Sequence, residues 1–160
     1  MDFIIRKGEI QDAQAILDLI HELAVFEKLP KEVEITIDDL RIDGFSKTPK
    51  FETFVAEDKE GYVFGMALFY ERYSTWKGTV IHLEDLMVTQ NKRGIGAGKA
   101  LYTAVLNYAY ERNLKRVCWE VLDWNSNAIA FYESTGAVID KGWYVVKMKE
   151  KNLKEFIENK

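Results

Sequence analysis

The spacing of apolar residues along the chain, together with start and stop signals, predicts five helices. In the first, one helical face carries Ile16, Leu19, Ile20 and Leu23. We expect Asp12 to cap this helix, because a carboxylate at the N-cap accepts a hydrogen bond from a free backbone N–H. We expect Pro30 to lie beyond its end, because the residue before a proline avoids the α conformation.

The other predicted helices have their own start and stop signals. Thr36 and Asp39 resemble a capping box for a short second helix, which Gly44 is expected to end. A fourth helix covers 126–134 before Gly136, and a polar helix closes the chain. The third and longest helix runs from about 98 to 112, and its apolar side consists of Leu101, Val105, Tyr108 and Ala109.

Runs of aromatic and apolar residues predict strands at 3–6, 51–57, 62–70, 79–88, 116–122 and 144–148. The sequence DKEG separates the second run from the third and is typical of a hairpin. Up to the closing helix, the element order is therefore βααβββαβαβ, in which an antiparallel front half leads into β-α-β-α-β. We expect an α/β (α+β) fold in a single domain, residues 1–160, with a mixed, mostly antiparallel central sheet flanked by helices.

Charge and cysteine content narrow the possible functions. The net charge of −4 argues against nucleic acid as a partner, since phosphate binding needs clustered positive charge, and it suits a cationic small molecule. The single cysteine, Cys118, excludes an intrachain disulfide. The chain opens MDFIIRKGEI without a signal segment and contains no run long enough to span a bilayer. We therefore expect a cytoplasmic protein with no membrane partner.

The glycine-rich segment KRGIGAGKA follows the strand predicted at 79–88 and opens the long helix. It is not a P-loop, because Gly98-Lys99 is followed by Ala100, and a dinucleotide fingerprint would place its third glycine at Lys99. The backbone N–H groups and the dipole at such a helix start form an anion site, with Arg93 and Lys99 adding positive charge. An ordinary strand-to-helix turn is the alternative interpretation.

Two segments resemble the GNAT superfamily of acetyl-CoA-dependent N-acetyltransferases. QNKRGIGAGKAL resembles the signature Arg/Gln-x-x-Gly-x-Gly/Ala through Arg93, Gly96 and Gly98, and LDWNSNAIAFYESTGA resembles the second cofactor segment. The resemblance implies a GNAT-like acyltransferase fold and acetyl-CoA as co-substrate, with no metal. It implies that residues 86–88 pair with the pantetheine arm between two strands that splay apart, and that 94–99 hold the pyrophosphate. The residues thus assigned to the cofactor are Leu86, Met87, Val88, Arg93, Gly94, Ile95, Gly96, Ala97, Gly98, Lys99, Asn125, Ser126, Asn127 and Ala128.

Acetyl transfer requires a neutral amine and a proton donor for the CoA thiolate. Tyr132, in AFYESTG, matches the position of the superfamily's general-acid tyrosine, the alternative being a buried aromatic on a helix face. By the same resemblance Glu84 is the base, acting through water, and Asp85 supports it. Neighbours on a strand point to opposite faces unless a bulge intervenes, and a purely structural carboxylate pair is the alternative. His82 is either a further base candidate or a core histidine.

The wider chain resembles the diamine acetyltransferase group, which includes spermidine/spermine acetyltransferases. HELAVFEKLP, DGF, YSTWKG, HLEDLMV and LDWN carry this resemblance, and their wording is nearer to the related thialysine N-epsilon-acetyltransferases. The residues that it places at the substrate are Phe26, Glu27, Glu84, Asp85, Cys118, Trp119 and Glu120.

Two departures from the diamine pattern bear on the acceptor. Phe26 stands where the pattern has Tyr, and Lys141 stands where an acidic substrate contact is expected. A cation at Lys141 disfavours a long polycation and suits a substrate that also bears a carboxylate. We therefore expect a lysine-like amino acid such as thialysine, or a short diamine, and a homodimer, as is frequent among small-substrate relatives. A protein N-acetyltransferase and a non-catalytic CoA- or amine-binding regulatory module are the alternatives.

Overall fold

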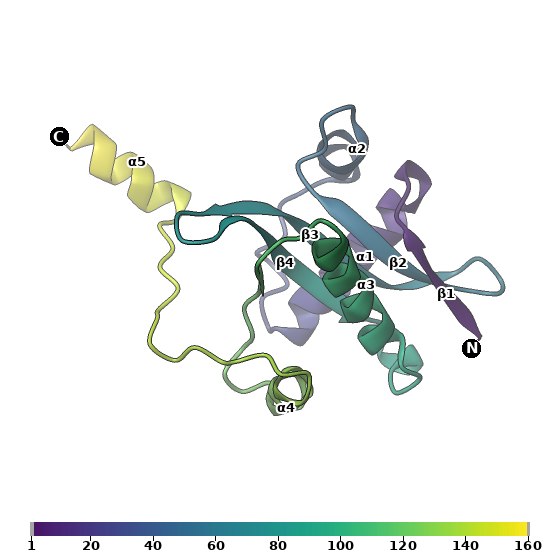
Figure 1. The fold of residues 1–160 in the computed structure, drawn as a ribbon. Helices are drawn as coiled ribbons and strands as arrows, with labels where there is room; N and C mark the ends of the chain where they lie inside the picture. Colours follow the sequence, from purple (N-terminus) through teal and green to yellow (C-terminus); the bar gives the residue numbers. More distant parts are fainter. Residues whose placement is uncertain (1, 160) are drawn as a thin grey trace. The chain divides into compact units, whose positions relative to one another are not determined.

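Five strands form one sheet in the order β1-β2-β3-β4-β5 (Figure 1). β1 to β4 are antiparallel neighbours, and β5 runs parallel to β4. The computed structural model describes residues 2–159. The predicted mixed, mostly antiparallel sheet is confirmed. Its strands are β1 (Phe3–Lys7), β2 (Glu52–Asp58), β3 (Val63–Ser74), β4 (Gly78–Val88) and β5 (Val117–Cys118).

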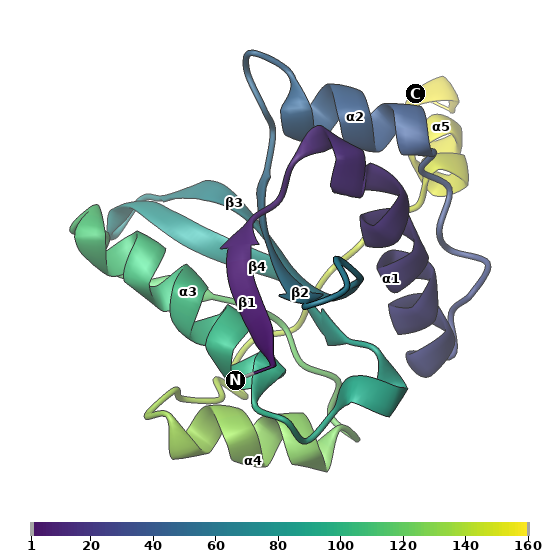
Figure 2. The ribbon, with the colours of Figure 1, turned by 90° about the vertical axis from the view of Figure 1, so that its right-hand side faces the viewer.

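Helices cover both faces of this sheet (Figure 2). α1 (Ala13–Phe26) and α2 (Ile37–Phe45) lie on one face, and α3 (Ala97–Glu111) lies on the other. Each helix turns its apolar side toward the sheet, as its periodicity predicts. The buried residues on the α1 side include Ile16, Leu19, Leu40, Val55, Met66 and Met87.

Most predicted elements lie within a few residues of their expected bounds. The hairpin at DKEG joins β2 to β3, and Thr36 and Asp39 form the predicted capping box of α2. The prediction that Gly44 ends this helix is wrong, since α2 continues to Phe45. A Cβ at Gly44 would lie 2.5 Å from the Phe51 ring, so glycine here permits a close approach rather than a turn.

The last two predicted strands differ from the structure. The chain divides into two units, one ending at Glu120, which contains the sheet, and the other Val121–Lys160. Of the predicted strand 116–122, only Val117–Cys118 is paired. The predicted strand 144–148 is wrong. The regular elements described in the second unit are α4 (Ser126–Ser134) and α5 (Glu150–Glu158), and its described residues include no strand with which 144–148 could pair.

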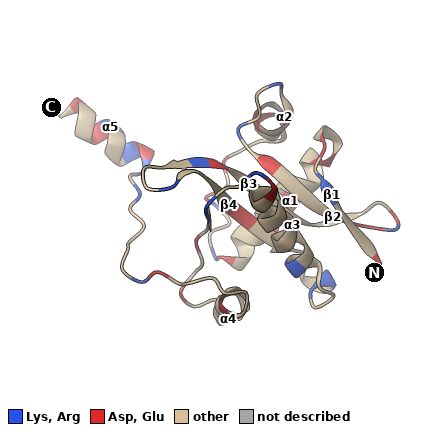
Figure 3. Cartoon of the chain, in the orientation of Figure 1, with Lys and Arg blue, Asp and Glu red and all other residues tan. Residues whose placement is uncertain are grey.

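Acidic and basic residues are mixed along the elements, and an acidic segment lies within β4 (Figure 3). Within 2–159 we find no helix that is both long enough and apolar enough to cross a membrane.

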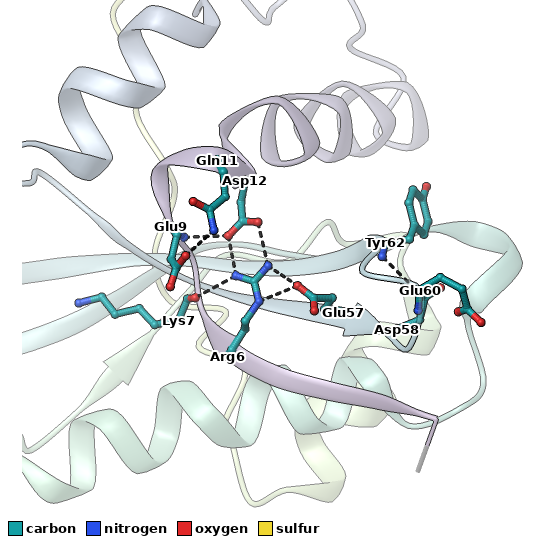
Figure 4. Close-up of polar contacts among 9 residues, drawn as sticks. All are labelled: Arg6, Lys7, Glu9, Gln11, Asp12, Glu57, Asp58, Glu60 and Tyr62. Carbon is teal, nitrogen blue, oxygen red and sulfur yellow. Dashed lines mark hydrogen bonds and ion pairs between the residues drawn. The ribbon is translucent and has the colours of Figure 1, made fainter.

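An ion-pair network connects the sheet to the start of α1 (Figure 4). Arg6 on β1 binds both carboxylate oxygens of Asp12, at 2.6 and 2.9 Å, and its Nε lies 2.7 Å from Glu57 Oε2 on β2. Burial opposes ionisation of Asp12, but hydrogen bonds from Arg6 and from the Glu9 backbone N–H outweigh it and lower the pKa of Asp12. The predicted position of the cap is confirmed, but the predicted capping bond is wrong. Asp12 occupies the N-cap position of α1, yet its side chain makes no capping bond, because the short helix η1 (Ile10–Asp12) and Arg6 engage it.

Candidate active site

The two carboxylates of HLEDLMV lie at a β-bulge in β4. Leu68 of β3 is opposite Asp85, and the next β3 residue is opposite Leu83. Glu84 is therefore the extra residue of the bulge, and the usual alternation of side chains is interrupted there. Residues opposite each other share a face, and Leu68 lies two residues from Met66 of the α1-side core. Asp85 therefore lies on the α1 side of the sheet.

Glu84 contacts two side chains from the same face. The Tyr70 hydroxyl donates a 2.9 Å hydrogen bond to Glu84 Oε2, and His82 Nε2 lies 3.4 Å from the same oxygen. Tyr70 and His82 are opposite each other in the ladder, with their ring centroids 5.2 Å apart. Burial and then the Glu84 carboxylate raise the pKa of Tyr70 to about 12, so its hydroxyl remains a donor at neutral pH. The Glu84 side chain is 52% exposed, and a ligand can reach it.

Asp85 is a carboxylate in surroundings that disfavour its charge. Burial, followed by the negative charges of Glu84 and Glu27, raises the pKa of Asp85 to about 6. Glu27 directly follows α1, so the helix and the bulge bring two further carboxylates, Glu27 and Glu84, within electrostatic reach of Asp85. Such a group favours a ligand that carries positive charge.

Beyond the carboxylates, one edge of β4 is open. β5 pairs with β4 at Ile81–Val117 and His82–Cys118, and in the described part of the chain no other strand pairs with this edge. Met87 is buried, while Leu86 and Val88 are half-buried. An open strand edge presents backbone N–H and C=O groups to an extended ligand.

The glycine loop follows β4 after η2 (Gln90–Lys92). Gly94 and Gly96 have φ angles of 82° and 89°, the left-handed region that glycine adopts without strain. Gly96 is the N-cap of α3, so the first N–H groups of that helix lack intrahelical acceptors and, with the helix dipole, form an anion site. These N–H groups belong to Ala97, Gly98 and Lys99, whereas Ile95 and the Lys99 side chain are exposed.

The side chain of Arg93, at the start of the glycine loop, contacts both β4 and α1. Its Nε donates a 3.0 Å hydrogen bond to the Val88 carbonyl, and its guanidinium lies 5.1 Å from the centroid of the Phe26 ring. Arg93, which was expected to add positive charge to the loop, therefore also connects the end of β4 to the end of α1.

Glu22 of α1 is a residue that sequence reasoning missed. Its carboxylate accepts hydrogen bonds from Thr89 Oγ1 at 2.6 Å and from the Gln90 N–H at 2.9 Å. These contacts join positions 67 and 68 residues apart, and no local pattern signals them. Because Phe26 and Glu27 follow in the next turn, Glu22 positions them relative to the loop.

The predicted substrate residues at β5 divide between the two faces. Cys118 Sγ lies 3.7 Å from His82 Nδ1 and so belongs to the carboxylate side. The Trp119 ring packs edge-on against Tyr102 of α3, at 5.5 Å between centroids, which places it on the other side. Glu120 is exposed at the end of the first unit.

The unit Val121–Lys160 holds the remaining predicted residues. Asn125 Oδ1 accepts a 3.3 Å hydrogen bond from the Ala128 N–H and caps α4, which begins with Ser126 and Asn127. Tyr132, on the same helix, is 8% exposed.

Comparison with known proteins gives the family. Residues 13–137 match the Acetyltransferase (GNAT) family. The chain is 36% identical over 162 residues to a thialysine N-epsilon-acetyltransferase of Bos taurus, covering 95% of each protein. It is 32% identical over 160 residues to the spermidine/spermine N(1)-acetyltransferase-like protein 1 of Homo sapiens, covering 94% of this chain and 23% of that protein. An integron cassette protein of V. cholerae has a TM-score of 0.79 at 21% identity, covering 99% of each chain.

The chain therefore belongs to the GNAT family of acetyltransferases. It is an acetyl-CoA-dependent N-acetyltransferase, as the resemblance of its sequence predicts.

Replacing Gly96 by alanine should weaken CoA binding by about tenfold. A left-handed non-glycine residue costs about 1–2 kcal/mol, which the loop can relieve only by turning its N–H groups out of line. Isothermal titration with CoA measures the change. Gly61→Ala is the matched control, since Gly61 has a φ of 81° in the β2–β3 turn and, like Gly96, open space around its Cβ position. Equal CoA affinities in the two variants would contradict this role of the loop.

Asp85→Asn should stabilise the fold at pH 8. The pKa of folded Asp85, about 6, lies above its ordinary value of 3.8, so the penalty for ionising it is absent below about pH 4 and complete above about pH 7. The variant removes this penalty, and its free energy of unfolding should exceed that of the wild type by about 1–3 kcal/mol at pH 8. Near pH 4 the two should agree, as urea denaturation at both pH values will show.

Asp2→Asn is the control for that comparison, because the Asp2 side chain is 90% exposed. Its effect should stay within about 0.5 kcal/mol at either pH. A gain for Asp85→Asn that is the same at pH 4 and pH 8 would exclude charge as its cause.

Proposed function

We propose that this enzyme transfers the acetyl group of acetyl-CoA to a primary amine of a small molecule by direct attack on the thioester. The observation that carries the proposal is the group of Glu84, Asp85 and Glu27 beside the open edge of β4. A cationic amine replaces the like-charge repulsion within this group by attraction, and the open edge adjoins the glycine loop, where an anion is favoured.

The cofactor residues are assigned in the same way. Leu86, Met87 and Val88 offer the strand edge to the pantetheine arm, and the N–H groups of residues 94–99 hold the pyrophosphate. Asn125 to Ala128, at the start of α4, provide further contacts. Acetyl-CoA, when bound, supplies an activated acetyl group, and this chain has to orient it and to move two protons.

The protons are assigned to two residues. Glu84 accepts the proton that the ammonium must lose, while Asp85 and Glu27 hold the positive charge of the substrate. The exposure of Glu84 and its bond to Tyr70 support this division, because a base needs both access and an ionised form. Tyr132 donates a proton to the departing thiolate.

The acceptor class follows from the relatives and from two residues of this chain. One relative is named for thialysine and another for spermidine and spermine, and all three compounds carry a primary amine. Phe26 lines the end of α1 without a hydroxyl, and Lys141 adds a cation that suits a carboxylate-bearing substrate. We therefore favour a lysine-like amino acid such as thialysine, or a short diamine, over spermine.

We also propose that residues 1–160 act as one N-acetyltransferase domain, in a cytoplasmic homodimer. The similarity to thialysine N-epsilon-acetyltransferases over nearly the whole chain supports the single domain.

A panel of thialysine, lysine, ornithine, putrescine and spermidine tests the acceptor, with release of free CoA as the readout. We expect the highest kcat/KM for thialysine or a short diamine. Turnover of a peptide N-terminus alone would favour a protein acetyltransferase. CoA binding without turnover of any amine would favour a regulatory module, and either result would overturn the proposal.

Tyr132→Phe should lower kcat by about a hundredfold and leave the affinity for acetyl-CoA nearly unchanged, since only the proton donor is lost. The matched control is Tyr110→Phe, which removes a hydroxyl from a residue of α3 that is 82% exposed. A wild-type kcat in the Tyr132 variant would exclude it as the acid.

A further inference from the structure

We propose that Arg93 makes the binding of the acceptor amine depend on CoA. Its guanidinium covers one face of the Phe26 ring, moves to the phosphates of CoA when these occupy the glycine loop, and so gives that ring face to an ammonium group of the acceptor. The inference rests on the proposed function, because it needs CoA at the loop and an amine near the end of α1. It goes beyond that function by naming the residue that connects the two sites.

The contacts of the Arg93 side chain are ones that a phosphate can replace. Its Nε donates a 3.0 Å hydrogen bond to the Val88 carbonyl, Nη2 lies 3.8 Å from Met87 Sδ, and the guanidinium lies 5.1 Å from the centroid of the Phe26 ring. A carbonyl, a thioether and a ring face are weaker partners for a guanidinium than a phosphate, which accepts short, charge-assisted hydrogen bonds. Arg93 therefore exchanges the ring for a phosphate held by residues 94–99, which directly follow it.

The Phe26 ring suits the acceptor once the guanidinium has left it. A ring face that attracts a guanidinium also attracts an ammonium, and two cations exclude each other from the same face. Phe26 directly precedes Glu27, which together with Glu84 acts on Asp85, so the ring adjoins the acidic group that favours a cation. Thialysine and the short diamines carry a second ammonium group, and they can offer it to Phe26 while the reacting amine meets Glu84.

Two hydrogen bonds hold Phe26 near the loop independently of Arg93. Glu22, one turn earlier on α1, accepts them from Thr89 Oγ1 at 2.6 Å and from the Gln90 N–H at 2.9 Å. Thr89 and Gln90 connect β4 to the glycine loop, so the end of α1 remains attached there whichever partner Arg93 contacts. The exchange therefore needs only a rotation of the Arg93 side chain, which is exposed.

Isothermal titration of the best amine of the panel, with and without saturating CoA, tests the inference. CoA carries no acetyl group, so no turnover occurs during the measurement. In the wild type CoA should raise the affinity for the amine by about fivefold, the size of one cation–ring contact. Arg93→Met removes the guanidinium but keeps a long side chain. Without CoA this variant should bind the amine about fivefold more tightly than the wild type, and CoA should add little.

Lys92→Met is the matched control. Lys92 also carries a positive charge beside the loop and also lies over a phenylalanine ring, that of Phe64, at 5.6 Å from its centroid. The substitution removes the same charge but leaves Arg93 and Phe26 in contact, so CoA should still raise the affinity for the amine by about fivefold. Phe26→Leu keeps an apolar side chain without the ring, and in this variant CoA should change the affinity by about twofold at most.

Because the coupling is reciprocal, the amine must raise the affinity for CoA by the same factor, and the titration can be run in either direction. Equal affinities of the wild type for the amine with and without CoA would overturn the inference. A wild-type ratio in Arg93→Met would also overturn it. If that variant binds no CoA, its affinity for the amine alone decides, and a value no higher than that of Lys92→Met contradicts the exchange.

Turnover of the amine panel separates this inference from the proposed function. If the enzyme acetylates a small amine but shows no coupling, the proposed function stands, and the contact between Arg93 and Phe26 is packing alone. If it acetylates none of the amines, the proposed function fails, and the inference fails with it.

Discussion

The β-bulge at Glu84 is the constraint on which the site depends. In a regular strand, adjacent carboxylates point to opposite faces and cannot act on one substrate. The extra residue in β4 brings Glu84 to the face that already carries Tyr70, His82 and Asp85. The same strand then continues past the end of β5, so that an acidic group and an open backbone edge adjoin within a few residues. Acetyl transfer needs this arrangement, because the acceptor amine and the acyl donor have to be bound next to each other.

The charges of two aspartates are treated differently by the fold: Asp12 belongs to a structural ion pair, and Asp85 lies in the candidate site. Asp12 is buried, but Arg6 pairs with it, and the pKa of Asp12 is lowered. Asp85 is acted on by burial and by the negative charges of Glu84 and Glu27, and the pKa of Asp85 is raised to about 6. The first arrangement stabilises the connection between the sheet and α1. The second costs stability, and a bound cation would recover that cost.

Local signals predicted much of this fold from the sequence. The bounds of α3 and α4 followed, to within a residue or so, from glycines and periodicity. The sequence left a bulge at Glu84 and Asp85 as an open alternative, because only the pairing of β4 with β3 shows which residue is extra. The strand expected at 144–148 shows the reverse case, since a suitable pattern becomes a strand only beside a hydrogen-bonded neighbour. The site residues came largely from the family resemblance, whereas the contacts of Glu22 and His82 depend on tertiary packing.

A crystal structure of the enzyme with CoA and thialysine, or the best amine of the panel, tests the central claim most directly. The account predicts that the pyrophosphate contacts the N–H groups of residues 94–99. It also predicts that the reacting amine lies within hydrogen-bond distance of Glu84, or of a water that Glu84 binds, with a carboxylate of Asp85 or Glu27 facing the substrate's positive charge. An amine bound on the α3 side of the sheet, or away from these three carboxylates, would contradict it.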